Sequence, residues 1–358
     1  MTSDRGKPDG AALVAAIRRW GIELGFQQLG VASVALDSAE KRLAEWLARG
    51  FHGDMEWMAQ HGTRRSRPQE LRPGTVSVIC ARMDYLPEAA DDAIRLLDHE
   101  RKAYISRYAL GRDYHKVLRG RLRKLARRIE AEIGAFGHRV FVDSAPVLEK
   151  PLAERAGLGW IGKHTNLINR RAGSWFFLGE IYTDLELPVD EPASGHCGSC
   201  RACIDVCPTQ AIVAPYQLDA RLCISYLTIE QKGAIPEALR PAIGNRIYGC
   251  DDCQLFCPWN KYAVQSTEAD FKPRHGLDDA DLVELMNWDE ATWLARTEGS
   301  AMRRIGYRGW LRNIAVALGN AKPSAAAIAA LRSRAAHSDP VVREHVHWAL
   351  QRQTQAVA

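Results

Sequence analysis

Cys197-Gly-Ser-Cys200-Arg-Ala-Cys203-Ile-Asp-Val-Cys207-Pro208 is the stretch that decides the fold of this chain. Its spacing, C-x2-C-x2-C-x3-C-P, is the spacing found in bacterial ferredoxins. In such a run the first three thiolates bind one 4Fe–4S cluster, and the fourth, which precedes proline, binds a second cluster. The stretch therefore predicts a ferredoxin-like segment with two clusters.

A second cysteine group, Cys250-Asp-Asp-Cys253-Gln-Leu-Phe-Cys257-Pro258, lacks the leading cysteine of a full run, and Cys223 upstream can supply it. The ferredoxin rule then predicts a crossed assignment. One cluster takes Cys197, Cys200, Cys203 and Cys257, and the other takes Cys207, Cys223, Cys250 and Cys253. Zinc is the alternative, because C-x2-C pairs also bind zinc, but it leaves both Cys-Pro endings unexplained. The ninth cysteine, Cys80, is expected to be a small buried side chain in a strand.

Composition sets only broad limits. The 358 residues are enough for two or three domains, and the 46% hydrophobic and 25% charged content is ordinary for a globular protein. The net charge of +5 is too small to identify a nucleic-acid partner. No apolar run is long enough to span a bilayer and no targeting segment is evident, so we expect a cytoplasmic protein with no membrane partner. A reducing compartment also argues against disulfides.

Hydrophobic patterning predicts helices over residues 11–25, 38–48 and 114–133. Strands are expected over 29–34, 75–85, 138–143, 166–169 and 174–182. Helices and strands mix without strict βαβ alternation, which favours an α+β class for residues 1–190. The ferredoxin-like segment covers 191–262, and the pattern of 263–358 is entirely helical. Within the last part, 312–318 resembles 343–350, which predicts a pair of HEAT-like repeats, with a plain helical cap as the alternative.

The ordered array of segments resembles the epoxyqueuosine reductase family, which are cobalamin-dependent, two-cluster enzymes of tRNA queuosine synthesis. The resemblance covers nearly the full chain. It rests on Val142-Asp-Ser-Ala-Pro-Val-Leu-Glu149, on residues 153–163, on both cysteine groups, and on residues 223–228 and 244–250. It implies a nitroreductase-like cobalamin-binding domain at 1–190, a two-cluster domain at 191–262 and a HEAT-like, tRNA-binding domain at 263–358.

The resemblance also implies an activity, the reduction of epoxyqueuosine to queuosine at the wobble position of tRNA. Electrons from an unidentified donor would pass through the two clusters to cobalamin bound base-off, in a monomer. Asp113-Tyr-His115-Lys-Val-Leu118 nearly matches the corrinoid signature D-x-H-x-x-G, but Leu118 stands where glycine is needed. We therefore do not expect His115 to ligate cobalt.

By the same resemblance Asp143 is the proton donor. A free aspartate is a poor acid at neutral pH, so we expect burial against the cofactor to raise its pKa. The alternative role for Asp143 is a helix N-cap, since Asp-Ser-Ala-Pro precedes a predicted helix. Cobalamin needs hydrogen-bond donors around its edge, and the family motifs place these at Arg65, Ser106, Asp143, Lys163, Asn166 and Ser225.

Two basic stretches are candidates for tRNA binding. Arg303, Arg304, Arg308 and Arg312 are interleaved with Tyr307 and Trp310, a combination that favours nucleic acid. The basic run in 115–130 is better explained as a solvated helix face. Two rival functions remain: a reductive dehalogenase-like cobalamin enzyme acting on a small molecule, and an electron carrier without chemistry of its own.

Overall fold

The computed structural model describes residues 9–87, 90–97 and 99–355. Its centre is a four-stranded antiparallel sheet with the strand order β1-β2-β7-β4. The bounds of these strands are Gln28–Ser33 (β1), Ser77–Asp84 (β2), Phe176–Thr183 (β7) and His138–Phe141 (β4). Almost every residue of the two central strands is buried, because helices cover both faces of the sheet.

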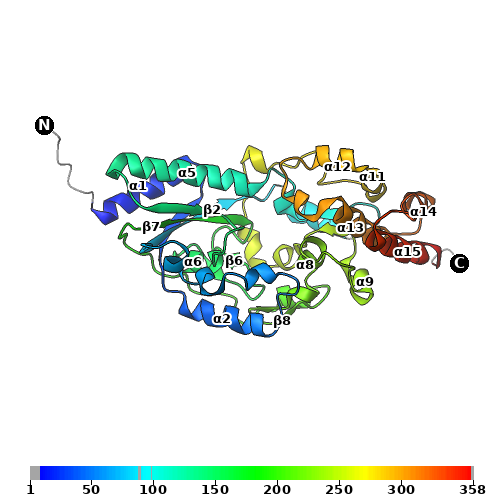
Figure 1. Ribbon diagram of the computed structural model, residues 1–358, viewed down its shortest axis with the longest axis horizontal. Helices are drawn as coiled ribbons and strands as arrows, with labels where there is room; N and C mark the ends of the chain where they lie inside the picture. The colour runs from blue at the N-terminus through cyan, green and yellow to red at the C-terminus, as the bar shows by residue number, and fades with distance from the viewer. Residues whose placement is uncertain (1–8, 88–89, 98, 356–358) are drawn as a thin grey trace.

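Figure 1 shows α1 (Gly10–Glu23) and α5 (Tyr114–Ile133) on one face of the sheet and α2 (Asp37–Ala48) and α6 (Glu149–Arg155) on the other. Strand β2 serves both layers, since successive side chains point to opposite faces. Ile79 packs with the α1 and α5 side, whereas Cys80 packs with the α2 and α6 side. The predicted α+β class is confirmed, and Cys80 is a buried strand residue as expected.

The remaining elements are mostly short. In the first half they are α3 (Pro68–Leu71), α4 (Ala90–Leu97), β3 (Tyr104–Ile105), β5 (Trp160–Ile161) and β6 (Leu167–Ile168). Around the cysteines they are α7 (Ala202–Asp205), β8 (Ile212–Ala214), β9 (Gln217–Leu218), α8 (Ile224–Ile229), α9 (Arg240–Ile243), β10 (Arg246–Tyr248) and α10 (Asp252–Leu255). The C-terminal helices are α11 (Leu282–Asn287), α12 (Glu290–Arg296), α13 (Gly306–Asn320), α14 (Ala325–Arg332) and α15 (Pro340–Gln355).

The C-terminal helices share a hydrophobic core with the cysteine-containing region. One core joins buried residues of 103–110, 220–248 and 277–349. The two stretches that resemble each other lie in α13 and α15, which pack against one another. The HEAT-like repeat and the three domain boundaries stay predictions, but the core does not divide at residue 262. Within the described part of the chain, no helix is both long and apolar enough to cross a membrane.

Arg312 anchors this shared core. It is 2% exposed and donates hydrogen bonds to the carbonyl oxygens of Leu227, Gln231 and Gly233 at 2.7–2.9 Å. Burial lowers the pKa of its guanidinium to about 10. A buried cation requires such partners, because unpaired burial of a charge is very costly. Arg312 therefore joins α13 to the segment that follows Cys223.

Replacing Arg312 with methionine should lower the free energy of unfolding by about 2–4 kcal/mol, since buried carbonyl groups lose a charged donor. Arg308→Met on the same helix is the matched control, because Arg308 makes only a half-exposed ion pair with Asp339. We expect the control to lose under about 1 kcal/mol. Urea unfolding of both variants measures the difference, and equal losses would contradict the structural role of Arg312.

Candidate active site

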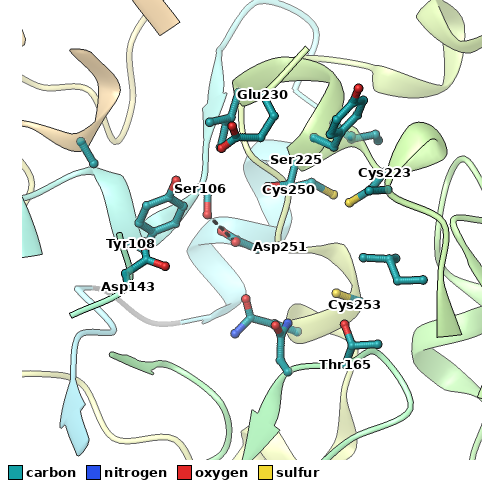
Figure 2. Close-up of a pocket in the computed structure, with 18 of the residues that line it drawn as sticks. Ser106, Tyr108, Asp143, Thr165, Cys223, Ser225, Glu230, Cys250, Asp251 and Cys253 are labelled. Carbon is teal, nitrogen blue, oxygen red and sulfur yellow. Dashed lines mark hydrogen bonds between the residues drawn. The ribbon is translucent and has the colours of Figure 1, made fainter. Parts of the chain in front are cut away.

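A cavity of about 910 Å³ lies between the sheet domain and the C-terminal helices. Its wall includes the first turn of α5, the loop after β4, the start of α8, both cysteine loops and residues 300–304. Figure 2 shows Cys223, Cys250 and Cys253 on one side of the cavity, with Asp143 and Tyr108 on the other. The cavity is therefore bordered by thiols on one wall and by titratable oxygens on the opposite wall.

The structure brings the eight cysteines together in two groups. Burial raises the pKa of the Cys203 thiol to about 11, and the charges of Cys257, Cys197 and Cys200 add to the rise. Burial also raises the pKa of Cys253, with contributions from Cys223 and Cys207. These proximities match the crossed assignment, which stays a prediction as far as iron is concerned. The members that line the cavity are Cys207, Cys223, Cys250 and Cys253.

A zinc site needs donors gathered around one ion. In the stretches 9–87, 90–97 and 99–355, no group of three or more His, Cys, Asp or Glu side chains is arranged to hold a single metal ion. A 4Fe–4S cluster spreads its thiolates more widely, because each thiolate binds a different iron atom. The spacing of the cysteines, with its two Cys-Pro endings, is what favours clusters over zinc.

Asp251 fixes the second cysteine loop to the sheet domain. Its buried carboxylate accepts hydrogen bonds from the Tyr104 hydroxyl at 2.8 Å, the Ser106 hydroxyl at 2.6 Å and the Arg107 backbone N–H at 2.8 Å. Strand β3 also pairs in parallel with β10, directly before Cys250. The cysteine wall and the sheet domain are therefore held in one fixed relation.

Asp143 lies in the loop after β4, in the left-handed backbone region with φ = 46°. It is not a helix cap, because α6 begins at Glu149 and Leu148 occupies the cap position. Its Oδ2 atom accepts a hydrogen bond from the Tyr114 hydroxyl and lies 3.1 Å from His115 Nε2. Its side chain is 52% exposed, and that exposure is to the cavity, which Asp143 lines.

The expectation that Asp143 has a raised pKa is wrong for the protein itself. Burial does act to raise the pKa of the carboxyl group, but hydrogen bonds from His115 and Tyr114 outweigh it and the net pKa is lowered. Burial alone would lower the pKa of His115, yet Asp113 and Asp143 raise it to about 9. At neutral pH the shared proton therefore resides on His115, next to an ionised Asp143.

Four of the predicted cofactor contacts besides Asp143 line the cavity: Arg65, Ser106, Asn166 and Ser225. Lys163 does not line the cavity. Its ammonium group donates instead to the carbonyl oxygens of Gly198 at 2.6 Å and Cys200 at 2.8 Å. The structure does not support Lys163 as a cofactor contact, because this side chain supports the first cysteine loop.

The four arginines predicted to bind tRNA have different surroundings. Arg303 and Arg304 line the cavity, and Arg304 also donates to Glu230 at 2.7 Å. Arg308 is exposed and pairs with Asp339. The prediction that Arg312 binds tRNA is wrong, because its guanidinium is buried among carbonyl groups.

The interleaved aromatics that favoured nucleic acid do not form a stacking surface. Trp310 is fully buried and stacks on Trp288, and the Tyr307 hydroxyl donates to a backbone carbonyl at 2.6 Å. On α5, the exposed basic residues are Lys116, Arg123, Lys124, Arg127 and Arg128, and their interpretation as a solvated face stays a prediction.

Several cavity residues were not predicted from the sequence. Tyr114 and His115 come from α5, and Glu149 comes from α6, so none of the three belongs to the loop that carries Asp143. Asp113 is the sequence feature that could have indicated His115, because it caps α5 and orients the His115 ring through a 2.8 Å contact with Nδ1. The near-match to a corrinoid signature thus marks a real site residue, although its role is to bind Asp143.

Comparison with known families gives the class of the protein first. Residues 196–260 match the model described as 4Fe-4S double cluster binding domain. An iron–sulfur domain of this kind, facing a large cavity lined by acid groups, defines an iron–sulfur oxidoreductase. Residues 65–144, which include Asp143, match the model described as Epoxyqueuosine reductase QueG, DUF1730.

The chain belongs to the epoxyqueuosine reductase family. It is 60% identical to the epoxyqueuosine reductase of Pseudomonas aeruginosa, over 96% of each chain. It is 56% identical to that of Escherichia coli, covering 95% of this chain and 89% of the relative. A crystal structure of an epoxyqueuosine reductase with an epoxyqueuosine-modified tRNA stem loop superposes with a TM-score of 0.88 at 27% identity, covering 96% of this chain and 91% of that one.

The raised pKa of His115 predicts a pH-dependent contribution to stability. Because the folded pKa of about 9 exceeds the usual 6.5, the stabilisation is complete below pH 6.5 and is lost as the pH rises through about 9. The free energy of unfolding of the wild type should therefore exceed that of His115→Gln by on the order of 1–3 kcal/mol near pH 6. This difference should shrink towards pH about 9.

Thermal unfolding at several pH values measures this gap, with His347→Gln as the exposed control on α15. A gap that stays constant with pH would show that His115 carries no additional proton in the folded protein.

Proposed function

We propose that this protein reduces epoxyqueuosine in tRNA to queuosine, with Asp143 and His115 supplying a proton to the oxygen that leaves. One observation carries the proposal: a single cavity joins a group of four cysteines to the Asp143–His115–Tyr114 cluster. The activity named for the relatives requires an electron supply and a proton supply at one place, and the cavity offers both.

The cavity residues fit cobalamin. The volume of about 910 Å³ lies at the upper end of ligand cavities, which run from about 300 to 1,000 Å³. Among the described residues, the buried Arg65 Nε and His164 Nε2 atoms have no hydrogen-bond partner, although both side chains line the cavity. Together with Asn166 and Ser225 they would hold the amide and phosphate groups at the edge of the cofactor, whereas the Ser106 hydroxyl already donates to Asp251. When bound, cobalamin would supply the reductive cleavage of the carbon–oxygen bond.

Base-off binding without a protein ligand agrees with the surroundings of His115 and His164, two of the three described histidines that line the cavity; the third, His61, is exposed. Both ring nitrogens of His115 are occupied by Asp113 and Asp143. His164 Nδ1 accepts the Asn166 backbone N–H at 3.1 Å, which places the ring proton on Nε2. A protonated Nε2 has no free lone pair for cobalt and acts as a hydrogen-bond donor instead.

We assign one 4Fe–4S cluster to each cysteine group. The group formed by Cys197, Cys200, Cys203 and Cys257 includes the exposed Cys200, so it is open to an external electron donor. The other group lines the cavity. Electrons would therefore enter at the surface and reach the cavity through two neighbouring clusters.

The proton chemistry follows from the geometry around Asp143. As negative charge develops on the departing oxygen, an acid must transfer a proton to it. The His115 imidazolium lies 3.1 Å from Asp143 Oδ2, so Asp143 can receive the proton from His115 and deliver it to the departing oxygen. Tyr114 donates to the same oxygen and orients the carboxylate.

The tRNA would approach at the mouth of the cavity. A wobble base can reach the cavity only if it is turned out of its stack, as for other enzymes that act on bases. Arg303 is exposed at the cavity wall and donates to the neutral Leu294 carbonyl at 2.5 Å, so it is the best placed of the predicted arginines to meet a phosphate. Arg304 is paired with the Glu230 carboxylate, and Arg308 is paired with the Asp339 carboxylate.

Replacing Asp143 with asparagine should slow queuosine formation by about 10²–10⁴-fold, the usual contribution of a general acid. The assay uses anaerobically reconstituted protein, a strong reductant and tRNA bearing epoxyqueuosine, and detects loss of oxygen from the nucleoside by mass spectrometry. Asp37→Asn, exposed at the start of α2, is the control. No conversion by the wild type, with clusters and cobalamin bound, would reject the substrate and favour a dehalogenase-like activity.

Removing one phosphate contact should change the salt dependence of tRNA binding. For Arg303→Ala we expect weaker binding. The slope of the logarithm of the binding constant against the logarithm of the salt concentration should be shallower by about 0.7–0.9. Arg332→Ala, an exposed position on α14, is the control and should bind as the wild type does. An unchanged slope for Arg303→Ala would exclude a phosphate contact at this residue.

A further inference from the structure

Behind Asp143 lies a second pair of carboxyl groups that the proton transfer described above does not use. Glu149 lines the cavity, and its Oε1 atom accepts the backbone N–H of Asp143. Glu180, on the central strand β7, is 0% exposed and stands opposite Phe141, two residues before Asp143. Glu149 and Glu180 lie close enough for each carboxyl group to shift the pKa of the other.

The surroundings of Glu180 require a proton at this pair. Neither of its carboxyl oxygens has a hydrogen-bond donor among the residues that the structure describes. An ionised carboxylate with no donor in such a place is very unfavourable. Glu149 can become the partner of Glu180 only if one of the two groups is protonated, because two carboxylates both only accept. The pair therefore holds at least one proton at neutral pH.

The charged and titratable groups around Glu149 come from every neighbouring element. They are Asp143 from the loop after β4, His115 and Tyr114 from α5, Cys80 from β2, Glu180 and Tyr182 from β7, and Lys150 from α6 itself. The Lys150 ammonium donates to the Thr165 carbonyl at 2.8 Å. Glu149 thus faces two other carboxyl groups, Asp143 and Glu180.

We propose that the Glu149–Glu180 pair, which shares at least one proton, is a second proton reserve that serves the reaction through the Asp143–His115 pair. This rests on the proposed function. Reduction of an epoxide to an alkene consumes two electrons and two protons, breaks both carbon–oxygen bonds and releases water. The electrons come from the external donor. The His115–Asp143 pair holds one proton, and the Glu149–Glu180 pair holds the other beside the same loop.

The titration of Glu149 suits this task. Burial raises its pKa to about 8, and the negative charge of Asp143 acts in the same direction. Burial likewise raises the pKa of Glu180 well above its usual value. A donor with a pKa near the working pH both carries its proton and releases it readily. Glu149 is a positioning and supply residue, since its contact on the protein side is with Asp143.

Infrared difference spectra of the cofactor-free protein test the protonation directly. Between neutral and alkaline pH the wild type should lose a protonated-carboxyl C=O band with a midpoint near 8, and Glu149→Gln should lack that change. In Glu180→Gln the amide can donate to Glu149 and stabilises its ionised form, so the midpoint should move to lower pH. Wild type with no such band at neutral pH would overturn the proposal.

Kinetics then test the role in the reaction. Glu149→Gln keeps an acceptor for the Asp143 N–H, so cluster content and tRNA affinity should be unchanged while the maximal rate falls at least about 10²-fold. Glu149→Asp should recover part of the rate, and Glu132→Gln, exposed on α5, is the control. A wild-type rate and pH profile in Glu149→Gln would overturn the proposal. If the band titrates but neither the wild type nor any variant forms queuosine, the protonation of the carboxyl pair is supported and the proposed function fails.

Discussion

The site depends on one buried carboxylate, that of Asp251. It lies between two cavity cysteines in the chain, Cys250 and Cys253, and accepts three hydrogen bonds from residues 104–107. A buried carboxylate needs such donors, so the loss of any one of the three bonds would leave its charge incompletely satisfied. These bonds join the second cysteine loop to residues 104–107, which precede α5 and its cavity residues Tyr114 and His115, so the two walls of the cavity are connected through this segment.

Across that cavity the two walls differ in chemistry. One wall gathers Cys207, Cys223, Cys250 and Cys253, and the other gathers Asp143, Tyr114, His115 and Glu149. The acid wall is a set of coupled groups in which the proton sits away from Asp143, on His115 and on the Glu149–Glu180 pair. An ionised Asp143 beside protonated neighbours is ready to receive a proton and pass it to substrate.

Local patterns in the sequence predicted the sheet strands, the long helices and the cysteine groups, because period and spacing are properties of contiguous residues. The position of Asp143 was also predicted, but its pKa was not, since His115 and Tyr114 approach it from another helix. The same limit explains why Arg312 and Lys163 were predicted as ligand contacts although both have structural roles. Nothing in a run of arginines shows which one turns into the core, and only the fold reveals that Lys163 meets the Gly198 and Cys200 carbonyls.

The central claim is that electrons and protons meet in this one cavity. Anomalous diffraction at the iron and cobalt edges, from crystals grown anaerobically with clusters and cobalamin, tests it most directly. We predict iron at both cysteine groups and cobalt inside the cavity, between Asp143 and the group containing Cys223 and Cys253. Cobalt bound outside the cavity, or no iron beside Cys223 and Cys253, would contradict the claim.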